Sequence, residues 1–147
     1  MPTLCENKKA KFEYQVLDTV EAGLTLTGPE VKSVRGGRMS LLGAYVTIAR
    51  GGVWLIGAHI QRYPNAGPQP DYDPERTRRL LLHKREIMKL AGKLEQKGLT
   101  LVPISVYTKG SKIKLSVGLA RGKKNFEKRE TLRKRDIDRD VRRSLKG

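Results

Sequence analysis

The chain shows a clear alternation of hydrophobic and polar residues along several short segments. Between residues 11 and 20, aromatic and β-branched residues alternate with polar ones, which is the period of two that a half-buried strand requires. Residues 21–23 then predict a turn, and residues 24–27 predict a short return strand.

Two further pairs of hydrophobic segments predict β-hairpins. Residues 44–49 and 53–60 flank Arg-Gly-Gly at 50–52, where glycine supplies the positive φ angles of a tight turn. Residues 99–107 and 113–119 flank a Lys-Gly turn, and the second of these segments alternates strictly. Pro103 lacks a backbone donor and therefore predicts a sheet edge or a bulge within this hairpin.

Two segments have the period of a helix. Pro29 and Glu30 favour a helix over residues 29–35, because Pro fits the first helical position and an acidic side chain is stabilised at the positive end of the helix dipole. Residues 84–97 have hydrophobic residues three or four positions apart and end at Gly98, as expected for a helix that covers a core.

Residues 61–79 contain four prolines, which predicts a long surface loop because proline removes backbone donors. Six short strands with one substantial helix do not fit a doubly wound parallel sheet, which needs a helix between successive strands. A mainly β fold is therefore expected: a small closed six-stranded barrel of the oligonucleotide-binding (OB) type, with flanking helices.

The division of the chain follows from its last 26 residues. Residues 1–121 are long enough to form one core. Residues 122–147 contain few large hydrophobic residues, so we expect a basic C-terminal tail that is flexible and disordered alone. Two i,i+4 pairs of opposite charge in this tail favour a helix when it meets an RNA surface.

Net charge narrows the class of partner. The formal charge is +16 over 147 residues, and such a field attracts polyanions, with nucleic acid the leading partner and an anionic membrane surface the alternative. No hydrophobic stretch reaches the length of a membrane span and no leader pattern follows Met1. The lone Cys5 forms no internal disulfide, so a cytoplasmic location is expected.

Catalytic and metal-binding chemistry find weak support. His59, His83 and Cys5 lack the spacing of metal ligands. Asp71, Asp73 and Glu75 offer oxygen ligands for Mg²⁺, but they lie on the proline-rich segment, where solvation and turn formation are the alternative reading. We therefore expect a protein without enzymatic activity, cofactor or metal.

Lys8, Lys9 and Lys11, near the N-terminus, and Lys32, Arg35 and Arg38, around the first predicted helix, are candidates for one basic face.

Four segments, NKKAKFEY, EAGLTLTGPEVKSVRGG, DPERTRRLLLHKREI and LARGKKNFEKRE, together resemble the small protein B family, the bacterial partners of transfer-messenger RNA in trans-translation. The resemblance covers nearly the whole chain in order. It implies an OB barrel that binds the tRNA-like domain of this RNA and delivers it, with elongation factor Tu, to stalled ribosomes. It also implies that the tail probes the empty decoding site and messenger channel and becomes helical there.

The resemblance also implies two sets of site residues. Those expected to bind RNA are Asn7, Lys8, Glu30, Lys32, Arg35, Arg38, Leu90, Lys123 and Lys124, and the tail residues expected to contact the ribosome are Phe126, Lys128, Arg129, Arg133, Lys134 and Arg135. Glu30 repels phosphate, so its expected role is to accept from a base edge or sugar hydroxyl, or to orient Lys32 or Arg35. Leu90 is equally suited to the core.

The tail departs from the family at two positions. Glu127 precedes Lys128 and Arg129 where Asp is usual, and Phe126 stands where His or Tyr is common. Two other functions remain as alternatives: a general ribosome-associated basic RNA-binding protein without a dedicated RNA, and a metal-dependent nuclease.

Overall fold

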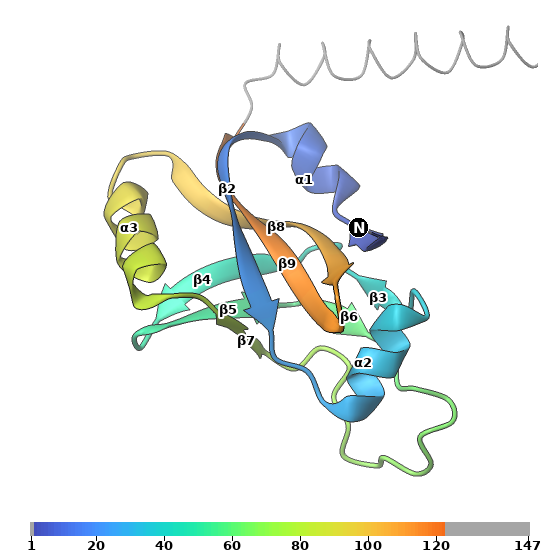
Figure 1. Ribbon diagram of the computed structural model, residues 1–147. Helices are drawn as coiled ribbons and strands as arrows, with labels where there is room; N and C mark the ends of the chain where they lie inside the picture. The colour runs from blue at the N-terminus through green and yellow to red at the C-terminus, as the bar shows by residue number, and fades with distance from the viewer. Residues whose placement is uncertain (1, 123–147) are drawn as a thin grey trace, which may run out of the picture.

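A computed structural model describes residues 2–122, which form nine strands and three helices (Figure 1). In chain order the elements are β1 (Thr3–Glu6), α1 (Lys8–Glu13), β2 (Tyr14–Leu24), α2 (Gly28–Arg35), β3 (Met39–Ser40), β4 (Tyr45–Ala49), β5 (Gly52–Ile56), β6 (His59–Ile60), β7 (Arg78–Leu81), α3 (Lys84–Leu94), β8 (Leu99–Lys109) and β9 (Lys112–Gly122). The expectation of a mainly β fold with flanking helices is confirmed.

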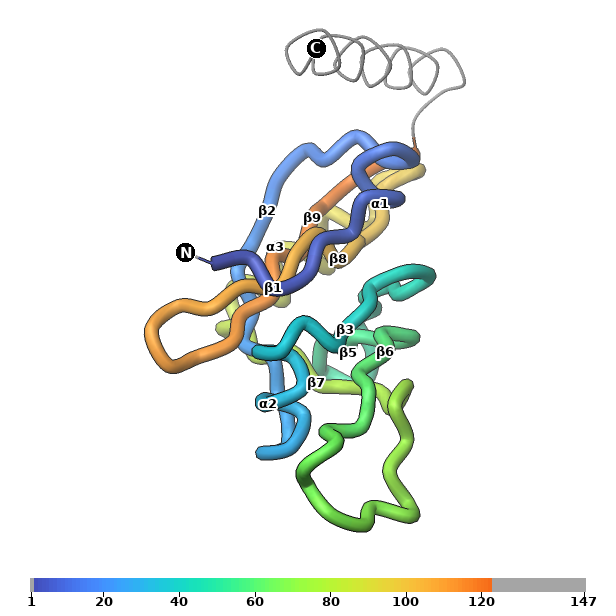
Figure 2. The backbone as a smooth tube through the Cα atoms, turned by 90° about the vertical axis from the view of Figure 1, so that its right-hand side faces the viewer, coloured from blue at the N-terminus to red at the C-terminus, as the bar shows by residue number. Residues whose placement is uncertain are grey.

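Seven strands form one antiparallel sheet in the order β1-β8-β9-β2-β7-β5-β4, and β3 pairs with β6 in a second, two-stranded sheet. The large sheet curves back on itself, so that β4 contacts β8 although no ladder joins them (Figure 2). Within residues 2–122 the hydrogen-bonded ladder is therefore open, and the expected count of six strands is too low.

Both hairpins expected around short glycine turns are present. Strands β4 and β5 pair from Tyr45 with Ile56 to Ala49 with Gly52, and Arg50 and Gly51 take φ angles of 51° and 72° in the turn between them. Strands β8 and β9 pair along their length, with a shift of register between Pro103 and Ser105. The predicted irregularity at Pro103 is thus confirmed as a bulge.

The first segment of the chain differs from its expected structure. Residues 8–13, partly assigned above to a strand, form α1, because the Asn7 side chain caps the helix by accepting from the backbone N–H of Ala10. The prediction of a turn at residues 21–23 is also wrong. Strand β2 continues to Leu24, since Glu21, Ala22 and Gly23 all pair with β9. Burial of Ala22 between paired strands favours the extended conformation there.

Two boundaries around the predicted long loop also differ. The expected strand over residues 53–60 breaks at Gly57, whose φ of 80° lies outside the extended region, so β5 and β6 belong to different sheets. At the other end of the loop, Arg78 begins β7, which pairs with both β2 and β5. A strand that begins with two arginines has no hydrophobic alternation at its start, which is why the sequence pattern missed it.

The core lies inside the curve of the large sheet. The alternating residues of β9, Ile113, Leu115, Val117 and Leu119, are all buried there, as their pattern predicted. Helix α3 packs on this core through Leu90, which is 8% exposed. In the described part of the chain, no helix is both long and hydrophobic enough to span a membrane.

Candidate nucleic-acid interface

Helix α2 begins with a capping box that fixes the position of Glu30. The Thr27 hydroxyl accepts from the backbone N–H of Glu30 at 3.3 Å, and the Glu30 carboxylate accepts from the backbone N–H of Thr27 at 3.0 Å. This reciprocal arrangement satisfies two backbone donors that a helix N-terminus otherwise leaves unpaired. It also turns the Glu30 side chain inward, where the residue is 1% exposed.

The buried carboxylate of Glu30 binds two arginines from the opposite end of the loop. Arg78, itself 0% exposed, donates from Nη2 and Nε to Oε2 of Glu30 at 2.6 and 3.1 Å. Arg76 donates from Nε to Oε2 at 3.2 Å and from Nη2 to Oε1. The Tyr72 hydroxyl donates to the same Oε2 at 3.1 Å. The buried carboxylate of Glu30 thus links helix α2, the loop and strand β7.

These contacts determine the protonation of Glu30. Burial by itself would raise the pKa of this carboxyl group, because it removes the charged form from water. Hydrogen bonds from Arg76, the Thr27 backbone and Arg78 outweigh burial and hold the pKa of Glu30 at about 2. Glu30 is therefore ionised at neutral pH.

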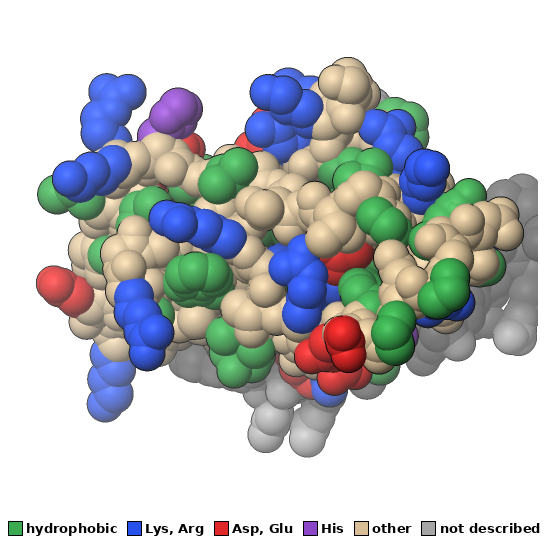
Figure 3. Space-filling model, turned by 90° about the horizontal axis from the view of Figure 1, so that it is seen from below, with side chains coloured by type: hydrophobic (Ala, Val, Ile, Leu, Met, Phe, Trp, Pro, Cys, Tyr) green, Lys and Arg blue, Asp and Glu red, His purple; other side chains and the backbone are tan. Residues whose placement is uncertain are grey.

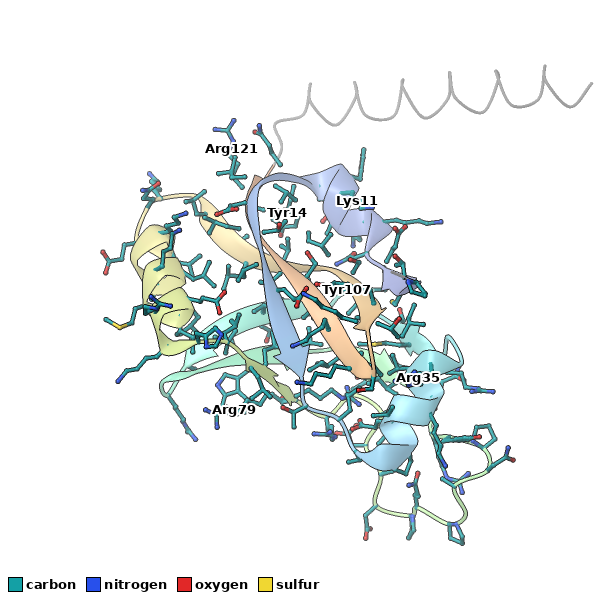
Figure 4. The ribbon with its side chains drawn as sticks, in the orientation of Figure 1. Lys11, Tyr14, Arg35, Arg79, Tyr107 and Arg121 are labelled. Atoms are coloured by element: carbon teal, nitrogen blue, oxygen red, sulfur yellow. The ribbon has the colours of Figure 1, made fainter. Side chains whose placement is uncertain are left out.

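Three basic residues expected to bind RNA lie on or just after α2. Lys32 and Arg35 are exposed and Arg38 is partly exposed. Arg35 donates from Nη2 to the Ser111 carbonyl at 2.9 Å in the β8–β9 turn (Figure 4). The Lys32 ammonium and the Arg38 guanidinium lie 5.7 and 5.9 Å from the centroid of the Tyr63 ring. The loop thus adds an aromatic ring to the basic surface of α2.

The start of the loop is anchored to α2 through Gln61. The buried Ser33 hydroxyl donates to the Gln61 carbonyl at 2.6 Å, and the Gln61 backbone N–H donates to the Arg38 carbonyl at 3.0 Å. The end of the loop is anchored as well, since Ile60 N–H donates to the Pro74 carbonyl at 2.9 Å and Arg78 Nη2 donates to the same carbonyl at 3.0 Å. Helix α2 and the base of the loop therefore form one connected surface.

The expected single basic face is divided between two ends of the molecule. Lys8, Lys9 and Lys11 belong to α1, whereas Lys32 and Arg35 belong to α2. Figures 1 and 2 both place α1 at the upper end of the sheet and α2 at the lower end, and Figure 4 shows Lys11 toward the upper end and Arg35 toward the lower end.

Three residues expected to bind RNA are largely buried. Asn7 is 7% exposed, and its Nδ2 donates to the Pro103 carbonyl at 2.9 Å, so it joins the cap of α1 to β8. Glu30 is engaged by Arg76 and Arg78 instead of the expected Lys32 or Arg35. Leu90 belongs to the core. In this structure all three have structural contacts inside the described part of the chain.

The remaining site residues fall outside the described part of the chain. They are Lys123, Lys124, Phe126, Lys128, Arg129, Arg133, Lys134 and Arg135.

Sequence reasoning missed Tyr63, Tyr72, Arg76 and Arg78 as parts of this site. A signal for the arginines was present, because Arg76, Arg78 and Arg79 follow one another closely after the proline-rich segment. An arginine whose guanidinium is buried needs an internal anion, and Glu30, which completes the capping box of α2, is the carboxylate that Arg78 contacts.

Two carboxylates at the end of the proline-rich loop, Asp73 and Glu75, have ordinary structural partners. Asp73 accepts from the Glu75 backbone N–H at 2.9 Å, and Glu75 lies 3.5 Å from Nδ1 of His59. On the outer face of the sheet, burial together with the hydrogen bond to Glu21 raises the pKa of Tyr107 to about 12. Across residues 2–122, no three His, Cys, Asp or Glu side chains converge as metal ligands.

Basic side chains are widespread on the face that contains this site. Figure 3 views the molecule from below, where Lys and Arg side chains are spread over the face and a smaller group of Asp and Glu side chains lies toward its lower edge. A surface of this kind attracts polyanions such as the phosphate backbone of RNA.

Comparison with known proteins identifies relatives over almost the whole length. The model of the SmpB protein family matches residues 4–147. An SsrA-binding protein from Gloeothece citriformis (strain PCC 7424) is 52% identical over 143 residues, which is 97% of this chain and 92% of the relative. Another from Thermosynechococcus vestitus (strain NIES-2133 / IAM M-273 / BP-1) is 48% identical over 97% of this chain and 94% of the relative.

A solved structure described as "tmRNA-SmpB: a journey to the center of the bacterial ribosome" matches with a TM-score of 0.67 and 42% identity. The match covers 87% of this chain and 93% of that chain.

Proposed function

The chain belongs to the SmpB protein family, and on this premise we propose that it binds the tRNA-like domain of transfer-messenger RNA and delivers it to stalled ribosomes for trans-translation. Its partners are this RNA and the ribosome, with elongation factor Tu in the delivery complex. Its activity is binding and delivery in the cytoplasm, without a catalytic step of its own.

The observation that carries this proposal is the basic surface of α2 and its loop. Lys32 and Arg35 are exposed on one short helix, and a buried ionic network at Glu30 holds this helix against strand β7. Exposed cations on a rigid element suit recognition of a structured RNA by shape and phosphate position. Asn7, Glu30 and Leu90 support this recognition by shaping the surface.

We also propose that the curved sheet functions as a barrel of the OB type. Its end strand β4 already contacts β8, and OB barrels are commonly only partly closed. The domain boundary then falls at residue 121. Residues 122–147 act as a separate basic tail whose Phe126, Lys128, Arg129, Arg133, Lys134 and Arg135 contact the decoding site and messenger channel, and Lys8, Lys123 and Lys124 add to RNA binding.

Sequencing the RNA that co-purifies with tagged protein tests this function. One strongly enriched RNA with a tRNA-like domain supports the proposal. Bulk ribosomal RNA would instead favour a general ribosome-associated protein, and RNA fragments that form only with Mg²⁺ would favour a nuclease.

A salt titration of binding to the tRNA-like domain tests the surface itself. The affinity is expected to fall steeply with salt, and the double variant Lys32→Ala/Arg35→Ala is expected to flatten the log–log slope by roughly 1.5, because each lost phosphate contact removes about 0.7 to 0.9. The matched control is Lys89→Ala/Lys97→Ala, which removes two exposed charges near α3. Equal slopes for the two double variants would contradict a specific role of α2.

A further inference from the structure

The Tyr63 ring lies between helix α2 and the segment that follows it. Its centroid is 5.7 Å from the Lys32 ammonium and 5.9 Å from the Arg38 guanidinium carbon. Cations at this distance from an aromatic ring are attracted by its quadrupole. Two like charges from different turns of the chain are therefore held near one neutral group.

The backbone around Tyr63 is held in place. Gln61, two residues earlier, is bound on one side by the Ser33 hydroxyl at 2.6 Å and on the other by the Arg38 carbonyl at 3.0 Å. After the ring, the Ala66 backbone N–H donates to the Tyr63 carbonyl at 3.2 Å, which forms a turn. Tyr63 is thus positioned by contacts to the same elements that carry Lys32 and Arg38.

Gly36 leaves the space that the Arg38 guanidinium occupies. A Cβ atom built on Gly36 would lie 2.3 Å from Nη1 and 3.2 Å from Cζ of Arg38. The φ of Gly36 is −83°, an angle that any residue adopts. The glycine therefore leaves room for the end of the Arg38 side chain, and a larger residue would displace that guanidinium without straining the backbone.

We propose that Lys32 and Arg38 act together as a phosphate clamp on RNA, with Tyr63 and Gly36 as the positioning residues that hold the two cations ready. The Tyr63 ring restrains two long side chains that would otherwise lose conformational entropy on binding. A phosphate oxygen then meets two donors already in place. This inference rests on the proposed binding of an RNA and adds which groups hold its backbone.

The first test replaces the ring. Binding of the full-length protein to the tRNA-like domain is measured at fixed salt, with thermal unfolding as the check on folding. Tyr63→Leu is expected to weaken binding about five-fold without a matching fall in melting temperature, since it removes both cation–ring contacts and no charge. Tyr63→Phe restores the ring and is expected to recover most of the lost affinity. Equal affinity of Tyr63→Leu and wild type overturns the proposal.

The second test displaces Arg38 while keeping its charge. Gly36→Ala forces the guanidinium away from its site and is expected to weaken RNA binding about three-fold. The control Gly92→Ala makes the same change on α3, where a Cβ meets nothing within 4 Å. If the two alanine variants bind RNA alike, the space above Gly36 has no part in the clamp.

A double-mutant cycle separates positioning from direct contact. Tyr63→Leu is combined with Lys32→Ala/Arg38→Ala, and in that background the loss of the ring is expected to have no further effect on affinity. Additive losses would show that Tyr63 contacts RNA independently and would overturn its positioning role. If the wild-type protein does not bind the tRNA-like domain, the proposed function is wrong. If the wild-type protein binds but the losses in the cycle are additive, only the positioning role of Tyr63 is wrong.

Discussion

At the scale of single residues, Glu30 is the buried anion on which the ion pairs of Arg76 and Arg78 depend. Its carboxylate is 1% exposed and accepts hydrogen bonds from Arg76, Arg78 and Tyr72. Glu30→Gln removes the anion and leaves the buried Arg78 charge without its partner, so we expect the free energy of unfolding to fall by about 3 kcal/mol. Urea unfolding at pH 7 measures this change. Glu75→Gln makes the same substitution at an exposed position and is expected to change stability little.

The depressed pKa of Glu30 predicts a pH dependence of folding. This group has an ordinary pKa of 4.5 and a pKa of about 2 in the folded protein. Because the folded pKa is the lower one, Glu30 stabilises the fold fully above pH 4.5, and this contribution is lost as the pH falls toward 2. Unfolding curves between pH 5 and 2 should therefore show a smaller loss for Glu30→Gln than for wild type. Parallel curves would contradict this assignment.

At the scale of elements, Gly57 decides where β5 ends. Its φ of 80° turns the chain from the large sheet into the small one, and a Cβ built on it would lie 3.4 Å from the Gly43 carbonyl oxygen and 3.6 Å from the Ala44 Cα. Gly57→Ala places a side chain in the left-handed region, which costs about 1 to 2 kcal/mol. Urea unfolding should show a lowered midpoint, whereas Gly92→Ala, on a helix with open space, should not. An unchanged midpoint for Gly57→Ala would show that the turn tolerates a side chain.

At the scale of the whole molecule, the charge is divided between the sheet domain and the tail. The 26 residues after Arg121 contain eleven Lys or Arg and five Asp or Glu but few large hydrophobic residues, and the described residues 2–122 contain a core cluster of their own. A chain ending at Gly122 is therefore expected to unfold near the full-length temperature and to bind the tRNA-like domain with little loss. We expect the truncation to abolish peptide transfer onto the RNA at stalled ribosomes. The single substitution Phe126→Ala should impair transfer less than the truncation does.

A reconstituted stalled ribosome with aminoacylated RNA measures peptide transfer. Normal transfer by the shortened chain would show that the tail has no such role. Loss of RNA binding together with transfer would show that the tail belongs to the RNA-binding surface.

Features that depend on neighbouring residues in the chain could be predicted from the sequence. The β4–β5 and β8–β9 hairpins were predicted because alternation and a glycine turn are properties of adjacent residues. Helix α2 was predicted from Pro29 and Glu30 for the same reason. The exposure of Lys32 and Arg35 followed from their places on that helix.

Contacts between residues far apart in the chain became known only from the folded structure. Arg78 is 48 residues from Glu30, and burial of both makes their pairing strong, whereas the same charges in solvent would interact weakly. The same holds for α1 and α2, whose lysines the sequence placed in one basic face and the fold placed at opposite ends of the sheet. Hydrophobic periodicity and turn-forming residues are properties of neighbouring positions in the chain. The partner of a buried charge depends instead on how distant segments pack together in the folded protein.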